Sequence, residues 1–305
     1  MALVNDVNEV SERPGPTSRM IALQFGTAST NRAGPHVEDA VATEEPLEIR
    51  LLVGRSRFPV AVTMRTPGND FELAAGFLFS EGVVKRREQV ARLSYCVDRE
   101  VAEEQRFNIV NVHLAAAGRD ASTGEVTSTG LGLERLERHF MMTSACGVCG
   151  KATLEALHQR GLEMIGEGPA LKPEVVVSLP EKMRRAQKLF DATGGVHAAG
   201  LFSPEGELLA VREDVGRHNA MDKLVGWAFL GDRLPLASKV LVVSGRASFE
   251  LVQKAVCAGA AALCAVSAPS NLAVQLAREF GLTLAGFVRP GGFKVYSGAE
   301  RLTRA

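Results

Sequence analysis

The chain has 305 residues, 46% of them hydrophobic, so it can bury a sizeable core as one large domain or two ordinary ones. Thirty-five basic and 35 acidic residues cancel to zero formal charge, and only 6% of residues are aromatic, which argues against a broad nucleic-acid-binding face. The longest apolar run, residues 255–266, is shorter than the roughly 20 residues of a bilayer span. Because the acidic first 45 residues also do not resemble a secretory leader, we expect a cytoplasmic protein that binds neither membrane nor nucleic acid.

The N-terminal part of the chain divides into a tail and a folded segment. Residues 1–45 mix Pro, Gly, Ser, Thr and charges without a sustained period, which predicts a disordered tail. Alternating apolar residues over 47–53 and a mostly apolar run over 58–64, on either side of a turn, predict a hairpin. A helix is expected between Asn69, as its cap, and Gly82, and a further strand over 109–114.

The boundary between two expected lobes falls at residues 163–172, which separates an N-terminal lobe (46–165) from an α/β lobe (166–305). In the second lobe the pattern predicts a helix at 180–190, hairpin strands at 196–202 and 207–212, then a helix at 219–229, a strand at 239–243, a helix at 248–256, a strand at 262–266, a helix at 270–280 and a strand at 283–287. Strands that alternate with helices of this length imply a largely parallel or mixed sheet covered by helices.

A cysteine pair is the most informative segment of the sequence. Cys146 and Cys149 lie three positions apart, flanked by glycines and followed by Lys151, which can favour the thiolate. Three chemistries fit this pattern: metal ligation, a thioredoxin-like redox centre, and a persulfide carrier. A structural metal site needs four ligands, and Cys96, Cys257 and Cys264 form no second pair, so we expect no bound metal. Those three cysteines lie in apolar patterns, which favours core packing for them.

Polar residues gather where several of the predicted strands end. Residues 212–223 crowd charges into a strand-to-helix junction, residues 243–248 form a second junction of the same kind, and the Gly-rich segment 287–294 carries Arg289 and Lys294. Ligands of open α/β sheets bind at the carboxyl ends of strands, where helix amides can hold an anion. The segments therefore predict a pocket for a phosphorylated or nucleotide-like ligand.

Six segments follow one another along the chain: RTPGNDFELAAGFLFSEG (65–82), TSACGVCGK (143–151), TGGVHAAGLF (193–202), REDVGRHNAMDKLVG (212–226), VSGRASFELVQKA (243–255) and GFVRPGGFKVYSG (286–298). Together they resemble the formate dehydrogenase accessory sulfurtransferase family, FdhD. The resemblance covers about residues 47–300 and leaves out the tail. The Cys-Gly-x-Cys-Gly and Arg-Glu-Asp-x-Gly-Arg-His-Asn segments are the most specific parts of it.

The resemblance implies a sulfurtransferase that accepts sulfane sulfur from a cysteine desulfurase as a Cys persulfide. The sulfur would pass to the Mo-bis(molybdopterin guanine dinucleotide) cofactor, an acceptor substrate that formate dehydrogenase needs for activity. The resemblance also implies an α/β, cytidine-deaminase-like mixed sheet covered by helices, with a smaller second lobe, and a homodimer. Cys146 would carry the persulfide, with Cys149 its partner.

The expected cofactor-binding residues combine the motif positions with the strand-end junctions. They are Phe287, Val288, Arg289, Pro290, Gly291, Gly292, Ser244, Gly245, Arg246, His197, Arg217 and His218. An alternative function belongs to another class: a non-catalytic chaperone that binds the cofactor and docks onto formate dehydrogenase, with a cysteine pair that only holds a metal.

Overall fold

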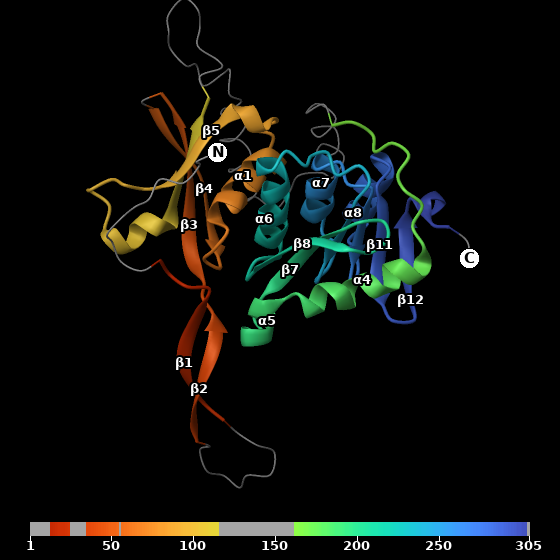
Figure 1. Cartoon of the computed structure of the whole chain (residues 1–305), viewed down its shortest axis with the longest axis horizontal. Coiled ribbons are helices and arrows are strands. Elements are labelled where there is room, and N and C mark those ends of the chain that lie inside the picture. Colours follow the sequence, from red (N-terminus) through yellow and green to blue (C-terminus); the bar gives the residue numbers. More distant parts are fainter. Residues whose placement is uncertain (1–12, 25–34, 55, 116–161, 304–305) are drawn as a thin grey trace, which may run out of the picture.

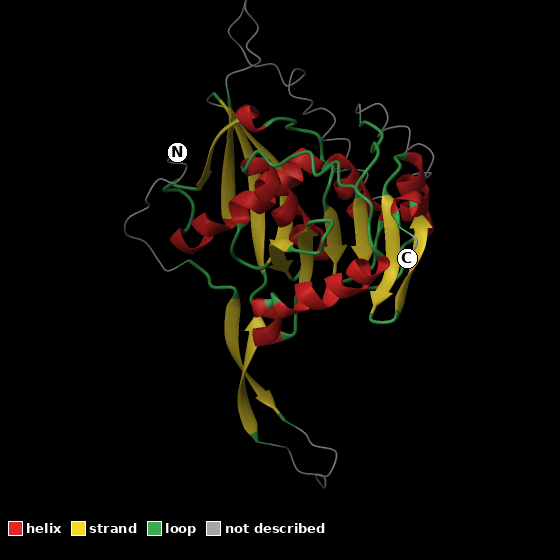
Figure 2. Cartoon of the chain, turned by 45° about the vertical axis from the view of Figure 1, so that its right-hand side comes forward, coloured by secondary structure: helices red, strands yellow, loops and turns green. Residues whose placement is uncertain are grey.

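A computed structural model describes residues 13–24, 35–54, 56–115 and 162–303 of the chain. Two β-sheets lie side by side with helices packed between and around them, and a two-stranded ribbon projects from this body (Figure 1 and Figure 2). The length and hydropathy of every described helix fall short of what a bilayer crossing requires.

The smaller sheet has four strands in the order β4-β3-β6-β5. Its strands and the helix that covers it are β3 (Glu45–Val53), β4 (Ser56–Arg65), β5 (Val90–Tyr95), β6 (Ile109–Leu114) and α1 (Asp70–Ser80). The predicted hairpin is confirmed as β3 and β4, and β6 runs parallel to β3. Leu47, Ile49 and Leu51 are fully buried on one face of β3, because alternate residues of a strand point to the same side.

The larger sheet has six strands in the order β12-β11-β10-β9-β7-β8. They are β7 (His197–Phe202), β8 (Leu208–Asp214), β9 (Val240–Val243), β10 (Ala262–Ala265), β11 (Thr283–Arg289) and β12 (Gly292–Ser297). The three central strands β9, β10 and β11 are parallel to one another, whereas β7, β8 and β12 pair antiparallel. The expected mixed sheet is therefore confirmed.

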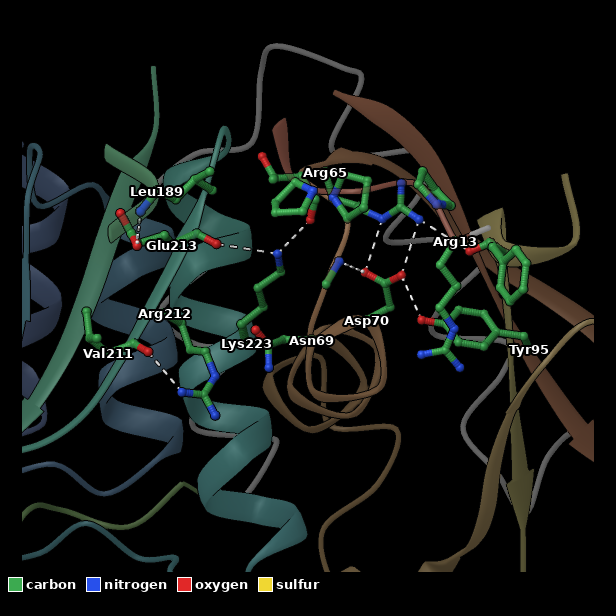
Figure 3. A pocket seen from close by; sticks show the side chains of 16 residues that line it. Arg13, Arg65, Asn69, Asp70, Tyr95, Leu189, Val211, Arg212, Glu213 and Lys223 are labelled. Atoms are coloured by element: carbon green, nitrogen blue, oxygen red, sulfur yellow. Dashed lines mark hydrogen bonds and ion pairs between the residues drawn. The ribbon is translucent and has the colours of Figure 1, made fainter. Parts of the chain in front are cut away.

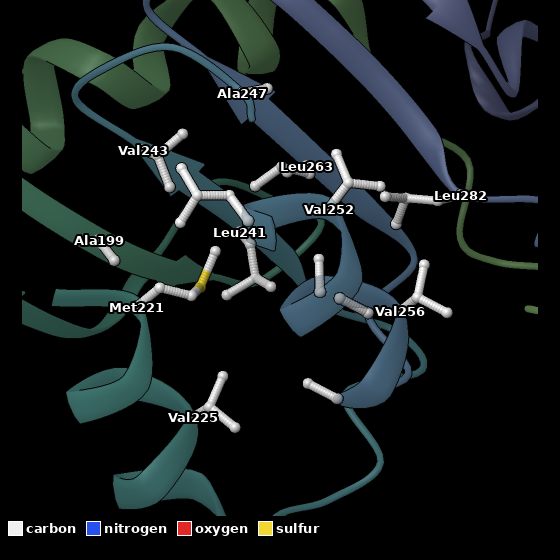
Figure 4. Close-up of a cluster of buried hydrophobic side chains, with 14 of the residues drawn as sticks. Ala199, Met221, Val225, Leu241, Val243, Ala247, Val252, Val256, Leu263 and Leu282 are labelled. Atoms are coloured by element: carbon white, nitrogen blue, oxygen red, sulfur yellow. The ribbon is translucent and has the colours of Figure 1, made fainter. Parts of the chain in front are cut away.

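Helices cover both faces of the larger sheet. They are α4 (Pro173–Arg185), α6 (Arg217–Leu230), α7 (Phe249–Cys257) and α8 (Asn271–Glu279), and a short helix α5 (Lys188–Thr193) without buried residues follows α4. On one face Leu241 and Val243 pack with side chains of α6, α7 and α8 (Figure 4). On the other face Val240 and Val242 pack against α4. Because both faces are covered, β9 is a continuous apolar run rather than an alternating one.

The two sheets are joined where α1 crosses α6. Gly76 of α1 and Gly226 of α6 meet at this crossing, where a Cβ added to Gly76 would lie 1.9 Å from the carbonyl oxygen of Asp222. Nearby, the buried Lys254 ammonium pairs with the Asp222 carboxylate at 2.7 Å. Only residues without a Cβ allow two helix backbones to approach this closely, so the glycines set the relative position of the sheets.

The helix expected at residues 180–190 is wrong in its extent. The structure has α4 from Pro173 to Arg185, with Pro180 inside it, and then a separate α5 from Lys188. Pro173 is in the first turn, where proline costs no hydrogen bond. Pro180 is tolerated because Val176, Leu179 and Met183 form a buried stripe against the sheet, and this packing outweighs one missing backbone bond.

The tail predicted over residues 1–45 contains regular structure, which corrects that part of the expectation. Strands β1 (Thr17–Leu23) and β2 (His36–Ala42) pair antiparallel along their full length. Met20, Ile21 and Leu23 stay largely exposed, so no buried face leaves an alternating pattern in the sequence. Backbone pairing between the two strands, together with contacts of their base with α5, holds this ribbon.

Candidate functional site

Parallel strands β9, β10 and β11 all end at one edge of the larger sheet. Strand β7 runs antiparallel to β9 and so begins at this edge with His197, and β8, antiparallel to β7, ends there with Asp214. A cavity of about 690 Å³ opens at this edge. We call it the strand-end cavity; its volume is in the range of sites for small ligands and cofactors.

The strand-end cavity is lined by five of the predicted binding residues: His197, Ser244, Val288, Arg289 and Pro290. Hydrogen bonds join the segments that carry them. The amide of Ala198 donates to Ser244 Oγ at 2.9 Å, and the amide of Ser244 donates to the Ala198 carbonyl at 3.0 Å. Two segments that lie 46 positions apart in the sequence are thus held together.

The turn after β11 has an unusual backbone. Phe287 has a φ of 54°, in the left-handed region that non-glycine residues rarely adopt, and a bulge disturbs the pairing of β11 with β12 between Gly286 and Arg289. The Phe287 amide donates to the Ser267 carbonyl at 3.2 Å, which ties the bulge to the loop after β10. The bulge changes the alternation of the strand, so Val288 and Arg289 both line the strand-end cavity.

Three arginines near this edge lack partners among the described residues. Arg217, Arg246 and Arg289 make no hydrogen bond or ion pair there, and the buried Nε atom of Arg217 has no acceptor. Burial, followed by the nearby charges of Arg217 and His218, lowers the pKa of His197. Guanidinium groups without a hydrogen-bonded carboxylate are suited to phosphate oxygens.

The remaining predicted residues lie around the strand-end cavity without lining it. His218 Nε2 lies 2.7 Å from Glu250 Oε2 and 3.2 Å from Ser248 Oγ, and its hydrogen bond lowers the pKa of Glu250. His218 thus links the first turns of α6 and α7. A Cβ on Gly245 would lie 3.7 Å from the His197 ring. Phe287, Gly291 and Gly292 belong to the turn between β11 and β12.

Sequence reasoning missed one wall of the strand-end cavity. The C-terminal part of α4 and the start of α5 contribute Met183, Arg184, Gln187 and Phe190. The guanidinium of Arg184 lies 4.4 Å from the centroid of the Phe190 ring and pairs with Asp191 at 2.5 Å. The amphipathic pattern of the segment predicted a helix, but it gave no sign that the end of this helix reaches the strand edge.

A second cavity, of about 360 Å³, lies where the two sheets meet (Figure 3). Several of its buried charged side chains have ion-pair partners. Arg65 binds both carboxylate oxygens of Asp70, at 3.1 and 3.2 Å, and Lys223 Nζ lies 2.7 Å from Asp214. Tyr95 donates to Asp70 at 3.0 Å. We call this the junction cavity; the buried pairs of Arg65 with Asp70 and of Lys223 with Asp214 each join a strand of one sheet to a helix that packs beside it, and the Arg13 guanidinium lies over the Tyr95 ring, 4.6 Å from its centroid.

The predicted catalytic cysteines, Cys146 and Cys149, lie outside the described residues. Packing of the other cysteines can be described: Cys96 and Cys264 are buried, which confirms their expected core role, and Cys257 is partly buried. Burial raises the pKa of the Cys264 thiol to about 12, so it is unreactive at neutral pH. Among the described residues, no three metal-binding side chains of His, Cys, Asp or Glu cluster.

The sequence is similar to known proteins over most of its length. The sequence model of the FdhD/NarQ family matches residues 42–303. Two similar curated proteins, each named sulfur carrier protein FdhD, come from Streptomyces avermitilis (48% identity, covering 93% of this chain and 94% of that protein) and Mycobacterium tuberculosis (49% identity, 87% and 92%).

Similarity in fold extends to a solved structure. A crystal structure of a protein from Desulfotalea psychrophila, provisionally described as a formate dehydrogenase accessory protein, matches with a TM-score of 0.65 and 22% identity. The match covers 94% of this chain and 99% of that one. Given the family match over most of the chain and relatives near half identity, the chain belongs to the FdhD/NarQ family.

Proposed function

We propose that this protein is a sulfur carrier that matures formate dehydrogenase by sulfurating its molybdenum cofactor. A cysteine desulfurase would supply sulfane sulfur, and the acceptor would be Mo-bis(molybdopterin guanine dinucleotide). Relatives named sulfur carrier protein FdhD, at 48% identity over nearly their full length, support the sulfur-transfer part. A homodimer with a cytidine-deaminase-like fold belongs to the same proposal and rests on the resemblance of the motifs.

One observation supports a nucleotide-bearing acceptor above others. The strand-end cavity combines apolar and aromatic lining residues with Arg289, whose guanidinium makes no hydrogen bond or ion pair to a described residue. A guanine nucleotide has a flat base at one end and phosphates at the other, so it matches this combination. In the junction cavity, by contrast, Arg65 and Lys223 are already held by buried carboxylates, and breaking such a pair costs several kcal/mol.

The sulfur step can be written with balanced electrons. The Cys146 thiolate attacks the terminal sulfur of the donor's persulfide, which forms the Cys146 persulfide and releases the donor thiolate. Delivery of that sulfur as hydrosulfide requires two electrons. The Cys149 thiolate supplies them by attacking Cys146 Sγ, which leaves a disulfide, and an external dithiol then reduces this disulfide to restore both thiols.

Mass spectrometry of the full chain after incubation with a cysteine desulfurase and cysteine tests the proposal. We expect an adduct of one sulfur atom on Cys146, absent from Cys146→Ala and retained in Cys257→Ala. Formate dehydrogenase should fail to mature in a strain that carries only Cys146→Ala. Normal maturation there would contradict the persulfide role. One zinc per chain that is lost with either Cys146 or Cys149 would instead support the metal-holding chaperone.

A further inference from the structure

Gln187 lies at the junction between α4 and α5, on the wall of the strand-end cavity that these two helices form. Its side chain is buried, with 3% of the residue exposed. Its backbone is fully used: the amide donates to the Arg184 carbonyl at 3.2 Å, and the carbonyl accepts from the Asp191 amide at 3.0 Å. The position of Gln187 is therefore fixed by the helix ends and not by its side chain.

The side-chain amide of Gln187 makes no hydrogen bond to a described residue. The fully buried side-chain atoms that lack a hydrogen-bond partner do not include the amide oxygen or nitrogen of Gln187. The amide therefore keeps a small exposed surface, and the residue lines the strand-end cavity. Burial of an amide without partners is unfavourable, and most buried polar groups of native proteins are satisfied. In the absence of a ligand, an apolar side chain at this position would avoid the cost of the unpaired amide. The presence of an amide therefore points to a ligand as its hydrogen-bond partner.

The residues that line the cavity with Gln187 are of two kinds. Met183, Phe190 and Val196 are apolar or aromatic and suit a flat heterocycle. At the strand ends lie Ser244 and Arg289, which suit phosphate oxygens. A carboxamide presents a donor and an acceptor in one plane. These match the adjacent carbonyl oxygen and ring N–H of guanine.

We propose that Gln187 is the residue that reads the guanine base, with its Oε1 accepting the ring N–H and its Nε2 donating to the guanine carbonyl. The phosphates would then extend toward Arg289 and the strand ends. This inference rests on the proposed function, because it takes the acceptor to carry guanine nucleotides. It adds that base recognition belongs to the α4–α5 junction, away from the motifs that identify the family.

Calorimetric titration of the full chain with GDP, and separately with pyrophosphate, tests this assignment. For Gln187→Leu we expect GDP to bind at least tenfold more weakly, about 1.4 kcal/mol, because a buried base would lose its paired hydrogen bonds. Pyrophosphate, which has no base, should bind this variant as it binds the wild type. Gln187→Glu should retain most of the affinity for GDP, since a carboxylate accepts from the two neighbouring N–H groups of guanine.

Gln275→Leu, the same change at an exposed position of α8, is the matched control and should bind both probes normally. The melting temperature of unliganded Gln187→Leu should equal or exceed that of the wild type, because an unpaired amide is removed. Equal GDP affinity of Gln187→Leu and wild type would overturn the inference and leave the proposed function intact. Equal losses for GDP and pyrophosphate would overturn it as well. A wild type that binds neither probe would refute the nucleotide pocket itself, and this assignment with it.

Discussion

The close crossing of α1 and α6 can be tested by replacing Gly76 with Ala. In an exposed helix this change adds about 1 kcal/mol of stability, because alanine has the higher helix propensity. Here the added Cβ would lie 1.9 Å from the Asp222 carbonyl oxygen and 2.7 Å from the Gly226 nitrogen. Ordinary contact begins near 3.4 Å, so the backbones must move apart by about 1.5 Å.

Overpacking of a core typically costs about 1–3 kcal/mol. Both obstructing atoms of this crossing belong to a helix backbone, which cannot rotate away as a flexible side chain can, so we place the cost at the upper end of that range. After the propensity gain is subtracted, Gly76→Ala should lower the free energy of unfolding by about 2 kcal/mol. Separation of the helices would also stretch the buried pair of Asp222 and Lys254.

Denaturant unfolding monitored by circular dichroism measures this loss, with linear extrapolation to water. Gly166→Ala serves as the control, because a Cβ there meets no atom within 4 Å, and it should leave the unfolding midpoint unchanged. A Gly76→Ala protein that is as stable as the wild type, or more stable, would refute the reasoning. The sheets would then not depend on backbone contact between α1 and α6.

Further predictions concern protonation, buried charge and thiol reactivity. The pKa of His197 lies below its usual value of 6.5. Negative phosphates bound beside the ring should raise that pKa, because they stabilise its protonated form. GDP affinity should therefore increase as the pH falls from about 8 to about 6. Calorimetry in buffers of different protonation enthalpy should show proton uptake, lost in His197→Gln. Asp70→Ala leaves the buried Arg65 guanidinium without its bidentate carboxylate and should cost about 3–5 kcal/mol of unfolding free energy; a smaller loss than 1 kcal/mol would contradict this. Cys264, with a pKa of about 12, should resist iodoacetamide in the native protein and react only after denaturation.

Much of the local structure could be predicted because it depends on short-range patterns in the sequence. Alternation over residues 47–53 indicates a strand with one buried face, and the structure confirms it as β3. The serines at 248 and 270 accept from the backbone amides of Leu251 and Ala273, and they cap the expected helices α7 and α8. Spacing and neighbours also mark the glycine-flanked Cys146 and Cys149 as a candidate thiol site, which stays a prediction because both lie outside the described residues.

Tertiary structure decided what these patterns do not encode. The β1–β2 ribbon buries little side-chain surface, so no periodicity marks it. Gln187 was missed because its role depends on which strand edge the end of α4 reaches, a distance that no local pattern contains. The same holds for the junction cavity, where Arg65 and Asp70 pair with each other in space. Sequence thus determined which elements form and which residues carry chemistry, whereas long-range packing decided which polar groups found protein partners and which remained available for a ligand.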